Sequence, residues 1–404
     1  MPHRESIYLA LVFGLLVIPR ILQRWKIPAP LTCLAIGIGT MLAWGDKTQD
    51  PVVALLSTLG ISSLFLFAGL EVDLRALRRR LWPLLVHLLL RACTLAALTW
   101  LGWRYAGMDW QVAGLIALAL LTPSTGFILD TLDRLGLDEG ERFWVTNKAI
   151  AGELLALAAL FVVLQADDPL RLGVSTLVIV GLLVGLPLLF IAFGRWLVPY
   201  APGSEFSLLV MVGFVAAFVT YQLGVYYLVG AFIAGLVARL LRVRMPRLAS
   251  NDNIHALRLF ATFFVPFYFF HAGTVVTRGA LGWDALALGM AITAVVLPLR
   301  IAMVWLQRRL LFGEKSFEGL RVSIALAPTL VFTLVLAEIL HSRFGLDDAL
   351  FGGLLLYAVL STLLPSLVLH TPFDIDPMQD MAVATEETPA SIPEREPDPD
   401  RAGA

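Results

Sequence analysis

The 404-residue chain has little charge and almost no cysteine: 15% of its residues are Asp, Glu, Lys or Arg, and only two are cysteines. A soluble protein carries about 25% charged residues, so an ordinary water-facing surface and a soluble multidomain enzyme are excluded. The cysteine count excludes a secreted disulfide scaffold. The balance of 30 basic and 31 acidic side chains excludes a nucleic-acid binder with a strongly basic face. Because 58% of the residues are apolar, an integral membrane protein remains.

The formal net charge of −1 hides an uneven distribution. From Thr371 onwards there are nine acids and two bases, which leaves 28 bases and 22 acids in the first 370 residues. The segment 372–404 is rich in Pro, Asp and Glu and predicts a disordered, acidic cytoplasmic tail. Cys33 and Cys93 both lie in apolar runs, which predicts small buried thiols.

Long apolar runs predict an all-α, polytopic membrane protein, because a bilayer core needs about 20 apolar residues per helix. We expect about 13 spans, at 6–23, 29–45, 52–70, 82–103, 111–130, 143–165, 173–197, 205–222, 225–241, 256–276, 284–306, 319–340 and 348–369. The second span is short and the hairpin near Gly224 is tight, so twelve is the alternative. The first span continues into basic residues and is not a cleaved signal peptide.

The distribution of lysine and arginine between the loops predicts the orientation. One set of alternate loops carries eighteen of these residues and the other set carries six. By the positive-inside rule, the N-terminus lies outside and the C-terminus in the cytoplasm of a cell (inner) membrane. All ten tryptophans lie within a few residues of a predicted span end, as in an aromatic belt.

Glu153 is the acidic residue placed at the middle of a span, the sixth; Glu71, Asp130 and Glu338 are placed at or beyond span ends. A charge at mid-membrane costs about 3 kcal/mol on insertion scales. Glu153 therefore needs a partner, water or a proton. The alternative is a carboxyl kept neutral or paired for packing alone, but buried ionisable groups usually mark a transport pathway.

Four basic residues also lie within spans. Arg91 and Arg300 are deep, and each can pair with Glu153 or with the negative C-terminal end of a broken helix. Lys148 and Arg258 lie nearer the ends and can extend to the interface. We expect Arg300 and Arg91 to support the site.

Two prolines interrupt spans at their centres: Pro123 in the fifth and Pro328 in the twelfth. Proline removes an amide donor and clashes with the preceding turn, so each break frees backbone carbonyls at mid-depth. Such irregular backbone is tolerated where it is buried in protein or lines a cavity.

The two breaks are 205 residues apart, and the same offset carries Arg91 to within one helical turn of Arg300. Spans four to six and eleven to thirteen are therefore predicted to be copies of a three-helix unit. An odd number of helices per copy means inverted repeats, with two broken helices crossing at mid-membrane. Glu153 maps near Tyr357 in the second copy, where there is no acid.

Four features resemble a known family: the segments 63–75 and 230–236, the break at 122–126, and Glu153 after it. They are similar to the cation:proton antiporter-2 family, which includes sodium/proton exchangers and Kef-type potassium/proton systems. The resemblance covers about residues 6–369. It implies the sodium/proton-antiporter fold and a homodimer.

The resemblance also implies a division of the chain and roles for particular residues. The family's ion-binding acid is usually an aspartate after Asn, Asp or Gln, and Glu153 after Gly152 takes its position when Arg142 is matched to the family's basic residue. Arg300 matches the basic residue of the late helix. The implied division is a dimer-forming part at 1–80 and 204–280, a core at 81–166 and 281–371, a linker helix at 170–199, and the tail at 372–404.

The leading functional prediction is exchange of a monovalent cation, sodium or potassium, for a proton by alternating access, with Glu153 as the shared site. Hard cations take oxygen ligands. The expected ligands are the Glu153 carboxylate, carbonyls freed at Pro123 and Pro328, and the hydroxyls of Thr122, Ser124, Thr125 and Thr329. A single acid favours an electroneutral cycle. No enzyme activity, cofactor, further metal or nucleic-acid partner is predicted.

Two alternatives remain open from the residues. Arg91 and Arg300 outnumber the lone acid, so the protein can instead carry an anion together with a proton. It can also be a sensor or scaffold that does not transport, with a permanent salt bridge between Glu153 and Arg300.

Overall fold

A computed structural model describes residues 2–45, 50–72, 81–166, 168–197, 199–201, 203–224, 226–243, 245, 250–312 and 316–369. These residues are helical or irregular, and none of them is in a strand. The predicted tail, 372–404, lies outside them, as do the last three residues of the motif at 63–75.

The described part of the chain contains thirteen helical segments, two of them broken, as predicted. Eleven are long and apolar enough to cross a membrane, and α2 and α11 are shorter apolar helices. The segments are α1 (Pro2–Leu22), α2 (Ala29–Trp44), α3 (Pro51–Leu70), α5 (Leu81–Tyr105), α6 (Trp110–Leu121) with α7 (Thr125–Thr131), α8 (Glu139–Gln165), α9 (Pro169–Trp196), α10 (Glu205–Gln222), α11 (Tyr227–Leu240), α12 (Asn251–Thr274), α13 (Trp283–Phe312), α14 (Ser316–Ala325) with α15 (Leu330–Phe344), and α16 (Asp348–Val368).

The alternative of twelve spans is wrong, because α10 and α11 are separate helices. The chain turns between them at Gly224, whose φ of 76° lies in the left-handed region that glycine adopts without strain. Both predicted breaks are present: α6 ends before Pro123, and α14 ends before Pro328.

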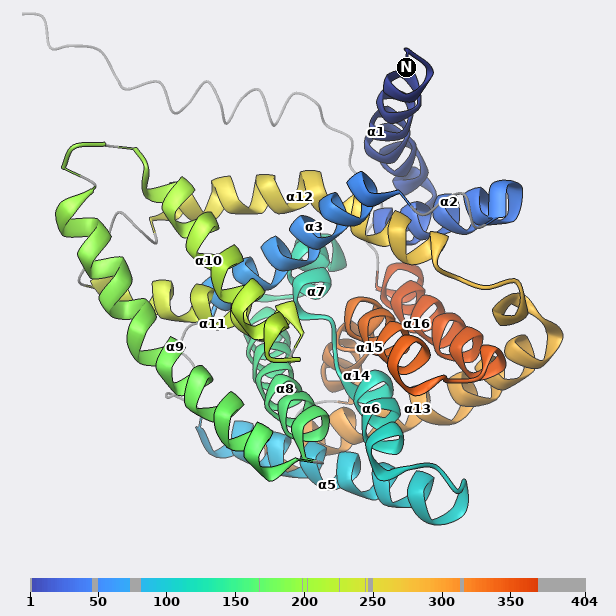
Figure 1. Cartoon of the computed structure of the whole chain (residues 1–404). Coiled ribbons are helices and arrows are strands. Elements are labelled where there is room, and N and C mark those ends of the chain that lie inside the picture. Colours follow the sequence, from blue (N-terminus) through green and yellow to red (C-terminus); the bar gives the residue numbers. More distant parts are fainter. Residues whose placement is uncertain are drawn as a thin grey trace, which may run out of the picture. The chain divides into compact units, whose positions relative to one another are not determined.

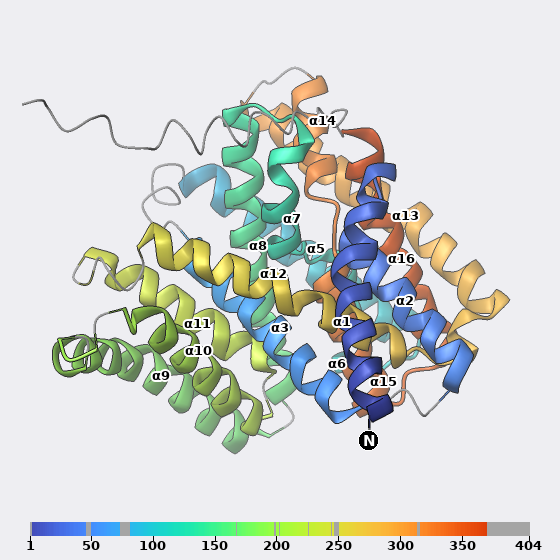
Figure 2. The ribbon, with the colours of Figure 1, turned by 90° about the horizontal axis from the view of Figure 1, so that it is seen from above.

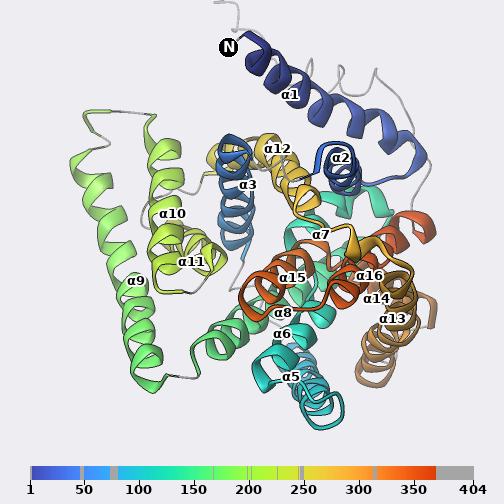
Figure 3. The same ribbon diagram turned by 45° about the vertical axis from the view of Figure 1, so that its right-hand side comes forward.

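The helices form two groups that share a long contact. Figure 1 shows α9, α10 and α11 at one end and α13 to α16 at the other. Between them, α3 and α12 lie side by side (Figure 2). The half-helix α7 lies between this pair and the pair α15 and α16, and it packs against α3 (Figure 3).

Two crossings in this central layer depend on facing glycines. Gly37 of α2 lies against Gly273 of α12, and Gly69 of α3 lies against Gly235 of α11. A Cβ on Gly37 or Gly235 would collide with a backbone carbonyl of the facing helix. An offset of about 200 residues relates Gly37 to Gly235 and Gly69 to Gly273, so the repeat carries one crossing onto the other. The inverted repeat therefore extends beyond the six helices in which the sequence indicated it.

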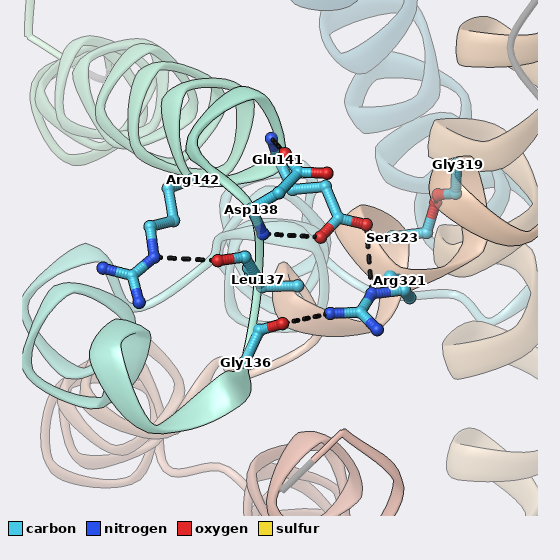
Figure 4. Close-up of polar contacts among 8 residues, drawn as sticks. All are labelled: Gly136, Leu137, Asp138, Glu141, Arg142, Gly319, Arg321 and Ser323. Carbon is cyan, nitrogen blue, oxygen red and sulfur yellow. Dashed lines mark hydrogen bonds and ion pairs between the residues drawn. The ribbon is translucent and has the colours of Figure 1, made fainter. Parts of the chain in front are cut away.

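The start of α8 is tied to α14 by a buried carboxylate (Figure 4). Glu141 completes a capping box with Asp138 at the start of α8. Its Oε1 also lies 3.0 Å from Nε of Arg321, which donates a second hydrogen bond to the carbonyl of Gly136. The two halves of the core are therefore joined by an ion pair at this end.

Cys33 is buried, as predicted, but Cys93 is exposed on α5. Few side chains of α5 are buried. An apolar run in a membrane protein does not distinguish a face that packs on protein from one that meets lipid.

Candidate ion-binding site

Glu153 lies in the middle of α8 with 2% of its surface exposed. Its Oε2 has no hydrogen-bond partner among the described residues. The neighbouring polar side chain is Thr125, the first residue of α7. The Thr125 hydroxyl is buried and also lacks a well-aligned partner in this part of the structure. Two oxygen-bearing side chains with unused bonding capacity thus lie together at the fifth-span break.

The two breaks cross in direct contact. The amide of Ser124 donates to the carbonyl of Pro328 (2.9 Å), and the Ser124 hydroxyl accepts from the amide of Val331 (2.8 Å). Pro123 and Pro328 therefore lie in one buried junction, as the paired offset predicted. The junction fixes the start of α7, and with it the position of Thr125 beside Glu153.

The last four carbonyls of α6 each have a donor, and three of the four donors come from other elements. The pairs are Leu118 with the amide of Thr122 (3.0 Å), Ala119 with the Thr333 hydroxyl (2.7 Å), Leu120 with the Tyr357 hydroxyl (2.7 Å) and Leu121 with the guanidinium of Arg91. A helix end leaves four carbonyls without intrahelical partners, so the break in α6 is fully satisfied. These carbonyls are already in use, contrary to the expectation that they are left as cation ligands.

Arg300 serves the corresponding end of α14. Its Nη1 donates to the carbonyl of Ala327 and to the Tyr357 hydroxyl, both at 2.8 Å, and its Nη2 donates to Leu326 (3.1 Å). Of the two pairings open to Arg300, the structure has the one with the helix end. The described residues contain no ion pair between Glu153 and Arg300, which contradicts the permanent salt bridge of the scaffold hypothesis.

Arg91 explains why glycine precedes the buried acid. Its guanidinium packs over Gly152, where a Cβ would lie 2.9 Å from Nη1. Arg91 thus occupies the space that a side chain at position 152 would need. Arg91 and Arg300 each bond the end of a broken helix, and neither forms an ion pair with the Glu153 carboxyl among the described residues.

The other predicted ligands are also buried. Thr122 lies at the C-terminal end of α6, where its amide donates to the carbonyl of Leu118, and the Ser124 hydroxyl bonds the second break as described. The Thr329 hydroxyl lies 3.1 Å from that of Ser361. Of the predicted hydroxyls, Thr125 is the one that the structure places beside Glu153.

The sequence analysis missed a buried polar network near one end of the core. Lys148 is fully buried, and its ammonium lies 2.9 Å from Oε1 of Gln307, so the expectation that it extends to the interface is wrong. Nδ1 of His87 lies 2.9 Å from the same oxygen, and Gln307 donates to Pro83 (3.1 Å). A neutral glutamine within an apolar span was the available signal.

Glu338 lies inside α15, not at a span end as hydropathy indicated; it is half-buried, with its carboxyl beside the Tyr226 hydroxyl. Five residues further on, Arg343 donates to the carbonyl of Gly224 (3.1 Å). Both contacts join α15 to the turn between α10 and α11. The helix extends further than hydropathy indicated, which is why the acid seemed to lie at its end.

A cavity of about 770 Å³ reaches the site between helices α1, α2, α3 and α12 on one side and α7 and α15 on the other. Leu64 and Phe67 of α3, Gly126 and Phe127 of α7, and Val331 of α15 line its inner part. Arginines line it as well, namely Arg20, Arg134 and Arg258. Since Gly126 follows Thr125 directly, the cavity reaches the break that carries the site.

Inverted, crossed half-helices beside one buried carboxyl in a helical bundle define the class of secondary transporters. The chain belongs to the sodium/hydrogen exchanger family, whose transmembrane model matches residues 8–374. The protein is thus a multi-pass membrane transporter of the cation:proton antiporter type, not an enzyme.

Two solved structures share this fold. The sodium proton antiporter MjNhaP1 from Methanocaldococcus jannaschii at pH 8 is 16% identical with a TM-score of 0.66, over 90% of this chain and 95% of that chain. An electron-microscopy structure of the same antiporter is 17% identical with a TM-score of 0.57, over 98% and 100% of the two chains. At this identity the likeness concerns the fold. No curated protein sequence matches the chain.

Proposed function

We propose that the protein exchanges sodium or potassium for protons and that Glu153 binds either the cation or the proton. One observation carries this proposal: Oε2 of Glu153 is buried without a partner among the described residues, next to the similarly buried hydroxyl of Thr125. Native proteins rarely leave buried polar atoms unpaired, and an ion or a proton is an accepted explanation. A carboxylate oxygen and a hydroxyl oxygen are the ligands that hard cations take.

The proposal includes an electroneutral cycle. Glu153 is the one carboxyl at the crossing of the described helices, so a single site is loaded with either one monovalent cation or one proton. Each loaded state carries the same charge, so the exchange rate does not depend on the membrane voltage.

The contacts on the two sides of the site support alternating access. The cavity of about 770 Å³ reaches Gly126 from the side of Arg134 and Arg258, which the loop charges assign to the cytoplasm. On the other side, α15 is held to the turn at Gly224 by Glu338 and Arg343. We take this arrangement as the inward-facing state, in which the latch of Glu338 and Arg343 closes the outer side.

The remaining parts of the proposal concern the setting. The protein lies in the cell (inner) membrane with its N-terminus outside and its C-terminus in the cytoplasm, and it forms a homodimer. In this scheme α1 to α3 and α10 to α12 form the dimer domain, and α5 to α8 and α13 to α16 form the core that moves against it.

Flux in proteoliposomes tests the site. Glu153→Gln keeps the size of the side chain and removes its charge, so cation-driven dissipation of a pH gradient is expected to fall to the level of empty liposomes. Glu139→Gln, on an exposed residue of the same helix, is the matched control and should transport like the native protein. Full activity of Glu153→Gln would refute the shared site.

Two further measurements use the same proteoliposomes. Sodium, potassium and lithium added in turn rank the transported ions. A clamped membrane voltage should leave the native exchange rate unchanged, and a rate that follows voltage would contradict the electroneutral cycle.

A further inference from the structure

A small cavity lies between the two arginines that serve the helix breaks. Its volume is about 40 Å³, and Arg91 and Arg300 line it together with His87 and Ser323. The rest of its lining is apolar and consists of Leu90, Leu121, Met303, Val304, Leu326 and Ala327. One water needs about 10–15 Å³ in this measure, so the cavity holds more than one water-sized occupant.

The charge around this cavity does not balance. The two guanidinium groups carry two positive charges, and they lie close enough to repel each other. The C-terminal ends of α6 and α14, which they serve, supply the equivalent of about half a negative charge each. Neither arginine has an ion pair with a carboxylate in the described residues, so about one positive charge is left over. Lys148 adds a further positive charge nearby.

Donors remain available at the cavity. A guanidinium has five N–H donors. Arg91 makes one of the hydrogen bonds described above, and Arg300 makes three. His87 is 4% exposed, and its Nδ1 faces Gln307. Its other ring nitrogen, Nε2, has no partner among the described residues. In the neutral ring that Nε2 accepts a hydrogen bond, which a water in the cavity can donate.

We propose that this cavity holds a resident monovalent anion of chloride size, bound between the guanidinium groups of Arg91 and Arg300, with a water bridging it to His87. The anion neutralises the charge that the helix ends leave over, since a buried unpaired charge is costly. The small volume of the cavity favours a monatomic anion over a larger organic anion. The anion stays bound as part of the core and is not cargo, so the proposal does not depend on the transport activity.

Stability at constant sodium tests the site. Full-length protein in detergent is unfolded by heat while sodium gluconate is replaced stepwise by sodium chloride or sodium bromide at fixed ionic strength. A saturable rise in the unfolding midpoint of about 2–4 °C is expected with chloride and bromide. An unfolding midpoint that is the same in all three salts would overturn the proposal.

Substitution of Arg91 supplies the matched comparison. Arg91→Gln removes one of the two positive charges that line the cavity and should lose the chloride dependence. Arg91→Lys keeps that charge and should keep the chloride dependence. Equal chloride dependence in the two variants would contradict the assignment.

Two measurements remain decisive if these variants do not fold. Crystals of the native protein grown with bromide should show an anomalous peak between Arg91 and Arg300, and a cavity without that peak would refute the site. Radioactive chloride should not accumulate in proteoliposomes under a pH gradient. Accumulation would show that the anion is cargo and would overturn its role as a resident ion, whatever sodium/proton exchange is measured.

Discussion

At the scale of single residues, the key pair is Glu153 and Thr125, which lie together at the crossing of the two broken helices. They come from different helices and are 28 positions apart, and the crossing of the breaks brings them together. Arg91 and Gly152 form a second complementary pair, in which the guanidinium takes the space of a missing side chain. The contact explains why a glycine precedes the acid in this chain.

The proposed role of Thr125 as a cation ligand predicts a specific kinetic change. Thr125→Val removes one oxygen but keeps the shape, so the KM for the cation should rise about tenfold, which corresponds to about 1.4 kcal/mol. The maximal rate should change little, because the carboxyl remains. Cation titration in proteoliposomes measures this.

Thr125→Ser is the control, since it restores the hydroxyl and should keep the native KM. An unchanged KM in the valine variant would show that Thr125 does not contact the ion.

At the scale of elements, different contacts hold the two broken helices at their crossing and away from it. The crossing itself is held by backbone and hydroxyl contacts between Ser124, Pro328 and Val331. The start of α8 is joined to α14 by the ion pair of Glu141 and Arg321. Since α14 is short, this pair contributes to keeping its position relative to α8.

Charge reversal tests that pair. Glu141→Arg or Arg321→Glu alone should lower the free energy of unfolding by about 1–2 kcal/mol, because two like charges then face each other in a partly buried site. The double variant should recover about half of the loss. Thermal or denaturant unfolding of the purified protein measures all three.

The pair of Arg142 and Asp133 is the control, since both of its side chains are exposed, at 38% and 77%. Its coupling should be near zero to 0.5 kcal/mol, roughly as for other surface pairs. An equally small coupling for Glu141 and Arg321 would mean that they do not hold the helices together.

The glycine crossings predict a second element-scale effect. Gly37→Ala places a methyl group against the backbone of α12, so the helices must move apart, at a cost of about 1–3 kcal/mol. Gly39→Ala lies one half-turn away on the same helix, where a Cβ meets nothing within 4 Å. That variant should be as stable as the native protein or slightly more stable.

Size-exclusion profiles and unfolding midpoints compare the two variants. Equal stability of Gly37→Ala and Gly39→Ala would refute the close approach of α2 and α12.

At the scale of the whole molecule, the inverted repeat determines how the two helix groups meet. The crossings at Gly37 and Gly235 exchange under the repeat, as do the arginines that serve α6 and α14. The symmetry is broken at the site, where one copy has Glu153 and the other has Tyr357. A cavity reaches the break that carries Thr125, and the contacts of Glu338 and Arg343 join α15 to the turn between α10 and α11, where we propose the latch.

The latch predicts a change in the population of states. Glu338→Gln weakens its contact with Tyr226 by about 1 kcal/mol, which shifts the population about fivefold towards the outward-facing state. In a background without the native cysteines, a cysteine at Phe127 in the cavity should then react about fivefold more slowly with an impermeant maleimide added from the cytoplasmic side. Tyr200→Phe, at an exposed residue, is the control, and an unchanged labelling rate in Glu338→Gln would contradict the latch.

Hydropathy, loop charge and proline position were enough to predict the thirteen helical segments, both breaks and the buried acid. These signals are local, because lipid requires each span to be apolar and each span to satisfy its own backbone. Sequence did not place Glu338, Lys148 or Cys93 correctly. Their burial depends on which neighbour packs against each face, and an apolar environment of lipid or protein leaves the same pattern in the chain.

The sequence by itself determined that this is an inverted-repeat membrane bundle with one carboxyl at its centre, since the cost of charge and open backbone in lipid restricts where such residues occur. Only the tertiary structure decided the partners. It assigned Arg300 and Arg91 to the ends of the broken helices and left Glu153 beside Thr125, because a guanidinium satisfies several carbonyls at a helix end that no local residue can reach.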